Sequence, residues 1–308
     1  MGKYIVRRLL QMIPVIIGAT FLIFVMVFGL PGDPAQGRCG ERPCPPSYVA
    51  AFNKEYNLDK PLVVQYLIYM GNVLQGDLGK TFYGNSVAHE LAIRFPTTIR
   101  LAVMAIIIEI VIGISAGILA GMRRGKFADS LVTVSTLLVI SIPVFVIGSL
   151  AQLIFGVKLG WFPVTALKGT TYELIMPAFV LASLSLAYVA RLMRTNLVEN
   201  LRADYVRTAK AKGLTQARTV GIHTLRNSLI PVITYIGIDL GALMGGAVIT
   251  ERIFNINGVG NFLYRSIHQK DGVAVVGTVT VLVLIYCLSN LLVDLLYGWL
   301  DPRIRYDS

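Results

Sequence analysis

The sequence contains few of the residues that build metal sites. Among 308 residues there are three histidines and three cysteines, and His89, His223 and His268 lie far apart in the chain. This scatter does not match the close ligand spacing of zinc sites. We therefore expect no metal centre.

Acidic residues are also scarce. Asp and Glu number 17 against 28 Lys and Arg, so the formal net charge is +11. Long apolar runs separate the basic clusters, and such clusters mark the cytoplasmic side of a membrane protein. We therefore interpret the excess positive charge as a topology signal and expect no nucleic-acid partner.

The sequence lacks a complete motif for catalysis or nucleotide binding. Gly113-Ile-Ser-Ala-Gly117 matches the G-x-S-x-G pattern of serine hydrolases, but no histidine lies inside an apolar run to act as the base. Gly79-Lys80-Thr81 matches the end of a phosphate-binding loop, but Leu74 replaces a required glycine. We therefore expect a chain that is not an enzyme and has no cofactor of its own. Energy from ATP must then enter through another subunit.

Long apolar runs dominate the rest of the chain. The mean hydropathy is +0.67, and 55% of the residues are hydrophobic. A helix needs roughly 20 apolar residues to cross a membrane. We expect six transmembrane helices at about 9–30, 101–122, 131–155, 174–192, 229–250 and 273–297. Lipid offers no hydrogen-bond partner for an open sheet, so the predicted fold class is an all-α integral membrane protein.

Basic residues set the expected orientation. Lys and Arg are concentrated in 123–128 and 193–228, and short basic loops face the cytoplasm. We expect both termini in the cytoplasm and the first span as an uncleaved anchor, because it is too long for a cleavable signal. The expected domains are a tail with the first span (1–30), an extracytoplasmic insertion (31–96), a core with helices two to six (97–300) and a cytoplasmic tail (301–308).

Two amphipathic helices are predicted in the insertion. Aromatic and aliphatic side chains recur at helical spacing after Ser47 and again after Pro61. These helices either cover the outer rims of the spans or form a platform for an external partner. Cys39 and Cys44 precede them, and a disulfide is plausible in an oxidising compartment, with two free thiols as the alternative. Cys287, in the last span, is expected to be a small apolar side chain.

Two rows of glycine occupy single faces of predicted spans. The first glycine row is Gly113, Gly117 and Gly121, and the second glycine row is Gly237, Gly241 and Gly245. A spacing of four residues places the members of each row on one face of their helix. Helix backbones approach closely at such rows in lipid. We expect packing surfaces, with gating as a secondary role. Prolines also occur in the spans: Pro143 in the third, and Pro177 and Pro231 near the starts of the fourth and fifth. Helix bundles tolerate them, and they permit bending.

Two acidic residues fall near the middle of predicted spans. Glu109 and Asp239 have no Lys or Arg at comparable depth, so each must face water, carry a proton or meet a partner. Glu109 continues the first glycine row and is expected to be structural. Asp239 points away from its row and is the better candidate for a translocation path, with a structural role as the alternative. Asp294 lies near the inner end of its span and is expected to be structural.

A short basic helix is predicted between two apolar runs, in Asp204-Tyr-Val-Arg-Thr-Ala-Lys-Ala-Lys-Gly213. Asp204 is expected to be the N-cap, Lys210 and Lys212 fall in the last turn, and Gly213 supplies the residue after the C-cap. A helix this short is marginal alone, which indicates a docking element held by neighbours or by a partner.

This basic helix resembles a signature of membrane permease subunits of bacterial ABC importers, in the dipeptide and oligopeptide branch that also includes nickel permeases. The signature of ABC importer permeases in general has a glutamate at the position of Arg207. The peptide branch has its own version of the signature, which this chain matches from Asp204 to Leu214 and again at Leu225-Arg-Asn-Ser-Leu-Ile-Pro231. Further matches cover nearly the whole chain: Pro31-Gly-Asp-Pro34, Leu58-Asp-Lys-Pro61, Gly76-Asp-Leu-Gly79, Thr250-Glu-Arg-Ile-Phe254, Gly258-Val-Gly260, Leu291 to Gly298 and Asp301-Pro-Arg303.

The resemblance implies partners. They are a homologous second permease, two cytoplasmic ATPase subunits or one fused ATPase that bind ATP and Mg, and an extracytoplasmic solute-binding protein, all at the bacterial plasma membrane. The helix would couple to the ATPase through Asp204, Arg207, Ala209, Lys210, Lys212 and Gly213, with Tyr205 and Leu201 as apolar anchors.

The expected function is import of dipeptides or short oligopeptides by alternating access. Nickel or another small solute is the alternative cargo. A proton-coupled secondary carrier, suggested by Glu109 and Asp239, is the competing class, but no inverted repeat supports it.

Overall fold

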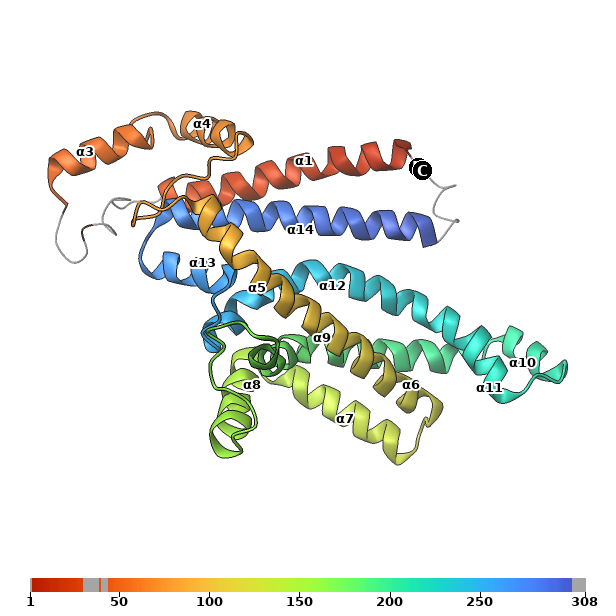
Figure 1. The fold of residues 1–308 in the computed structure, drawn as a ribbon. Coiled ribbons are helices and arrows are strands. Elements are labelled where there is room, and N and C mark those ends of the chain that lie inside the picture. Colours follow the sequence, from red (N-terminus) through yellow and green to blue (C-terminus); the bar gives the residue numbers. More distant parts are fainter. Residues whose placement is uncertain (1, 30–38, 40–43, 301–308) are drawn as a thin grey trace. The chain divides into compact units, whose positions relative to one another are not determined.

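Helices make up the regular structure of the described residues. A computed structural model describes residues 2–29, 39 and 44–300, and within these ranges the only β pairing is an isolated bridge between Lys80 and Ser86 (Figure 1). The all-α prediction is confirmed for this part of the chain.

The elements follow one another along the chain, with η marking π-helical segments. They are α1 (Gly2–Phe24), η1 (Val25–Gly29), α3 (Pro46–Glu55), α4 (Leu62–Leu74), α5 (Val87–Ile108), η2 (Glu109–Ile114), α6 (Ser115–Met122), α7 (Phe127–Ser141), α8 (Val144–Ala151), η3 (Gln152–Lys158), α9 (Thr171–Asn200), α10 (Asp204–Ala211), α11 (Gln216–Arg218), η4 (Thr219–Thr224), α12 (Leu225–Ile253), α13 (Val259–His268) and α14 (Gly272–Leu300).

Several helices are long and apolar enough to cross a membrane. In the described ranges these are four segments, Val6–Gly29, Val87–Met122, Thr171–Asn200 and Gly272–Val293, with a bent pair as a fifth. The chain is therefore a multi-pass membrane protein. α12 covers the predicted span 229–250, where the side chains at 242 and 244–246 lie outside the described set. The count of six spans stays a prediction.

The third predicted span, 131–155, is not one continuous helix. α7 ends at Ser141, α8 begins at Val144, and the two parts are bent by 104°. Pro143 offers no N–H and disfavours the helical conformation of the residue before it. Ile142 is accordingly extended, at φ −105° and ψ 127°. By contrast, Pro177 and Pro231 lie within the first two turns of α9 and α12, which accommodate them.

The second predicted span begins earlier than expected. Its helix starts at Val87, so the helical segment Val87–Met122 reaches back into the range assigned to the insertion. The chain divides into two compact units, residues 1–98 with 257–308 and residues 99–256. Unit one therefore includes α13 and α14, which the sequence analysis grouped with the core.

In unit one, α4 lies against α1 and α14. Tyr66 Oη and Thr20 Oγ1 are 2.8 Å apart, and Tyr69 Oη donates to Thr280 Oγ1 at 2.9 Å. Phe24 packs with Tyr66 in the buried cluster there. The apolar face of α4 thus covers its own chain, which supports the first of the two interpretations of the insertion helices. The other insertion helix, α3, begins at Pro46, so Ser47, which was expected to precede the helix, is its second residue.

In unit two, α9 is the central helix. It contacts η2, α6, α7, α8 and α12, and its residues Val189, Met193 and Leu197 are fully buried.

The first glycine row packs directly on α9. A Cβ added at Gly117 would lie 2.5 Å from Met193 Cβ and 2.6 Å from the Ala190 carbonyl oxygen, closer than real Cβ contacts. At Gly113 and Gly121 the nearest side-chain atoms would be 2.9 and 3.0 Å away. Only glycine permits this approach of η2 and α6 to α9.

We predict that Gly117→Ala lowers the free energy of unfolding by about 1–3 kcal/mol, because the added methyl overpacks the contact with α9. Thermal or denaturant unfolding in detergent measures the change. Gly221→Ala, in the same unit and with no atom within 4 Å of its added Cβ, is the matched control. Equal stability of the two variants would contradict the prediction.

Candidate functional site

The basic helix forms, but its first residue differs from the prediction. α10 runs from Asp204 to Ala211, and the N-cap is Ala203, which makes no side-chain capping bond. The prediction of Asp204 as N-cap is therefore wrong. As the first helical residue, Asp204 places its carboxylate at the positive end of the helix dipole. Its Oδ1 also lies 3.6 Å from Arg207 Nη1 on the exposed surface.

The C-terminal end of α10 has the predicted form. Lys212 is the C-cap, and Gly213 has a positive φ of 79°. The Gly213 N–H donates to the Lys210 carbonyl at 2.9 Å, and the Leu214 N–H donates to the Ala209 carbonyl at 3.2 Å. This pair of bonds is a Schellman motif, in which the left-handed residue is usually glycine. The motif turns the chain sharply toward α11.

α10 is held by its own chain on one face only. Val206 is 1% exposed, and α10 contacts η4. Arg207, Lys210 and Lys212 are exposed. Val206, one residue after Tyr205, lies on a different face of the helix from Tyr205 and was not predicted as an anchor.

Leu201 and Tyr205 were predicted to be apolar anchors of the same helix, but they belong to different helices. Leu201 is the C-cap of α9, outside α10, and packs against the buried cluster around Met193. Tyr205 is 37% exposed, and its hydroxyl donates to Asn200 Oδ1 at 2.8 Å. Helical spacing does not relate them, because the chain turns between the two helices. Tyr205 alone stays available to a partner.

An ion pair joins the first turn of α7 to α9. Arg194 donates from Nε to Asp129 Oδ1 and from Nη2 to Asp129 Oδ2, the latter at 2.8 Å, while the Gly125 N–H donates to Asp129 Oδ2 at 2.9 Å. Bidentate pairs of this kind fix geometry as well as charge. This pair was not predicted, because Asp129 and Arg194 lie far apart along the chain and one sequence does not show that they meet.

The two acids in the spans come together. Glu109 on η2 and Asp239 on α12 interact with each other, and Ser185 of α9 is a partner of Asp239. Glu109 is fully buried and Asp239 is 9% exposed. Among the described residues, both Glu109 oxygens and Asp239 Oδ2 find no donor. Two ionised carboxylates can only accept, so a hydrogen bond between these two side chains requires a proton on one of them.

We predict that Glu109→Gln unfolds close to the native temperature, because the amide can donate to Asp239 in place of the proton. Glu109→Leu should be less stable by about 1–3 kcal/mol, because a buried acceptor loses its partner. Thermal unfolding of the two variants in detergent makes the comparison. A glutamine variant as unstable as the leucine variant would exclude the proton between the two acids.

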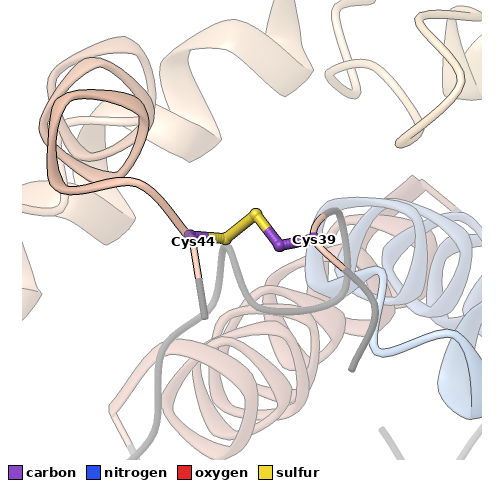
Figure 2. Close-up of a disulfide and its surroundings, with 2 residues drawn as sticks. All are labelled: Cys39 and Cys44. Atoms are coloured by element: carbon purple, nitrogen blue, oxygen red, sulfur yellow. A yellow bond between two sulfur atoms is a disulfide. The ribbon is translucent and has the colours of Figure 1, made fainter. Parts of the chain in front are cut away.

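The remaining candidate residues are placed as follows. Cys39 and Cys44 form a disulfide (Figure 2), and Cys287 is buried with a free thiol. In the second glycine row, Gly241 is buried and Gly237 is half-buried, while the surroundings of Gly245 lie outside the described set.

No group of three metal-ligating side chains occurs within the ranges described.

Comparisons with known proteins match nearly the whole chain. The family described as "Binding-protein-dependent transport system inner membrane component" matches residues 113–306. The family of the N-terminal part of such membrane components matches residues 1–102.

Curated relatives match from end to end. The di/tripeptide transport system permease protein of Pseudomonas aeruginosa (strain UCBPP-PA14) is 38% identical, covering 99% of both chains. The dipeptide transport system permease protein of Escherichia coli (strain K12) is 37% identical, with 99% of both chains covered. The glutathione transport system permease protein of Pectobacterium atrosepticum is 36% identical, with 99% of this chain and 100% of the relative covered.

Proposed function

We propose that this chain carries dipeptides and other short peptides across the bacterial inner membrane. The chain belongs to the family of binding-protein-dependent transport inner membrane components. The chain is a permease subunit of an ABC importer, and ATP hydrolysis belongs to a separate subunit. One observation carries the choice of cargo. Relatives that match from end to end are named for di/tripeptides, dipeptides and glutathione, all of them small peptides.

The coupling surface for the ATPase is the exposed face of α10, with Tyr205, Arg207, Lys210 and Lys212. Two contacts support this role. Tyr205 bonds Asn200, the last residue of α9, and α10 contacts η4, which leads directly into α12. A push on α10 would therefore reach both long helices as a largely rigid movement.

The permease works as one half of a heterodimeric pore with six spans and both termini inside. Its partners are a homologous permease, two ATPase chains or one fused ATPase with their ATP and Mg, and an extracytoplasmic binding protein. The insertion, 31–96, lies outside. One face of α4 covers its own chain, and the other, with the exposed Val63 and Leu67, meets the binding protein. The disulfide of Cys39 and Cys44 supports this placement, since disulfides persist in oxidising compartments.

Asp239 and Glu109 remain candidates for the translocation path. Their burial against each other favours the structural role in the conformation described here. Alternating access would bring them to water only if η2 and α12 separate.

We predict that Gly213→Val uncouples ATP hydrolysis from uptake, because a β-branched residue is strained at φ 79° and the Schellman turn that orients α10 is lost. ATPase activity and peptide uptake are measured together in liposomes containing the whole importer. Gly84→Val is the matched control, because it has the same kind of backbone, φ 83°, away from α10. Coupled uptake by the Gly213 variant would contradict the role of α10.

The function itself is tested by uptake of a radiolabelled dipeptide into cells that carry or lack this chain. We expect uptake that depends on the chain and continues when the proton gradient is collapsed at constant ATP. Uptake that stops with the gradient would favour the secondary carrier. Chain-dependent uptake of nickel without uptake of dipeptide would favour the alternative cargo.

A further inference from the structure

Two tyrosines and an arginine meet on the surface of unit two where α9 and α12 run side by side (Figure 1). The ring centroids of Tyr188 on α9 and Tyr235 on α12 are 6.1 Å apart, and the guanidinium carbon of Arg191 lies 5.2 Å from the centroid of the Tyr188 ring. Tyr188 is 46% exposed, and Tyr235 and Arg191 are partly exposed. These three side chains form the tyrosine–arginine face, which a molecule outside unit two can reach.

The side chain of Arg191 points away from the nearer end of its helix. α9 runs from Thr171 to Asn200, so Arg191 lies about 30 Å from the first residue and about 14 Å from the last, at 1.5 Å per residue. An arginine near the end of a span ordinarily extends toward the headgroups at that end. The contact with Tyr188, one turn closer to the middle of α9, holds the guanidinium in the opposite direction.

The charge of Arg191 has no acidic partner in the described part of the chain. The ring of Tyr188 is its contact there, and the ion pairs of these ranges involve other arginines, among them Arg194 one turn along α9. A charged side chain in a span ordinarily meets an opposite charge or a water-filled cavity, because lipid tails solvate it poorly. The tyrosine–arginine face therefore meets water or an anion.

Polar contacts connect this face with the buried acid pair. Ser185 of α9 is a hydrogen-bond partner of Tyr235 and of Asp239, and Asp239 interacts with Glu109. Polar groups thus continue from the interior of unit two to the exposed ring of Tyr188. Ionisable side chains inside spans commonly mark the path of a substrate, so this face is the accessible part of such a path.

The chemistry of the tyrosine–arginine face fits the C-terminal end of a peptide. A guanidinium group forms two parallel hydrogen bonds with a carboxylate. Tyrosine rings pack on apolar side chains, and their hydroxyls form hydrogen bonds with peptide groups of any sequence. Because the terminal carboxylate is common to all unmodified peptides, one arginine can hold cargoes whose side chains differ.

We propose that Arg191 binds the C-terminal carboxylate of a short peptide during its passage through the membrane, while Tyr188 and Tyr235 contact the last residue of that peptide. This assignment rests on the proposed function and names side chains that touch the cargo. The phosphate of an anionic lipid headgroup can satisfy an arginine in the same way and is the competing source. A carboxylate of the second permease is the other competitor.

The first test captures the cargo on the face. Benzoylphenylalanine, a photo-crosslinking amino acid, replaces Tyr188 in the whole importer, which is reconstituted in phosphatidylcholine liposomes and supplied with binding protein, ATP and radiolabelled alanyl-alanine. The matched control carries it in place of Phe179, which is 47% exposed and lies about two and a half turns earlier, on the opposite side of α9. We expect label on the chain at position 188 and not at 179. No label at 188, or equal label at both positions, overturns the proposal.

The second test concerns the charge of Arg191. In the importer with the crosslinker at 188, Arg191→Gln should lower the label roughly tenfold or more, the effect of losing a charged hydrogen bond. Arg191→Lys keeps the charge and should retain several times the label of the glutamine variant. Arg123→Gln, at an exposed arginine of the same unit, should leave the label unchanged. Equal loss in the glutamine and lysine variants, or loss in neither, would remove the carboxylate contact.

Two further arms identify the anion. Adding phosphatidylglycerol to the liposomes should leave the label unchanged, and its loss would make the lipid the occupant. The second permease should co-purify equally with the parent chain and with Arg191→Gln, and its loss from the variant would assign Arg191 to the contact between subunits. Either result overturns the assignment to cargo.

The inference and the proposed function fail in different ways. Dipeptide uptake by cells that carry the chain, without label at position 188, would remove the inference and leave the proposed function standing. Absence of chain-dependent dipeptide uptake would remove the proposed function itself.

Discussion

The packing of the first glycine row on α9 is the constraint on which unit two depends. Lipid is as apolar as a leucine side chain, so helices associate in a membrane through close contact and hydrogen bonds. At Gly117 no space remains for even one methyl group. Glu109, at the start of η2, lies beside this contact and interacts with Asp239 of α12, which is also a partner of Ser185 of α9.

The same helix connects the features expected to matter for coupling. α9 carries Ser185 beside the acid pair, Arg194 in the ion pair with Asp129, and Asn200 in contact with Tyr205 of α10. A helix fixed at three points along its length transmits displacement without bending, because each contact resists local rearrangement. If the ATPase binds at α10, as proposed, these contacts would carry its movement along α9.

The sequence predicted helices well and predicted contacts poorly. Apolar runs, glycine spacing and the C-terminal glycine of α10 are local signals, and the helices, the first glycine row and the Schellman turn follow them. Asp204 and Leu201 were misplaced because the start of a short helix depends on how the preceding turn packs. Asp129 and Arg194 were missed, and Glu109 and Asp239 were left without partners, since pairing across distant helices leaves no trace in one sequence. Pro143 was expected to permit bending, and the chain bends there by 104°, an angle that a proline in the sequence does not specify.

Purification of this chain from its native membrane in mild detergent, with identification of the co-purifying chains and an ATPase assay, tests the central claim most directly. The account predicts recovery of a second permease, ATPase chains that hydrolyse ATP, and a binding protein that carries a short peptide. A chain recovered alone that still transports peptide after reconstitution, driven by a proton gradient and without ATP, would contradict it.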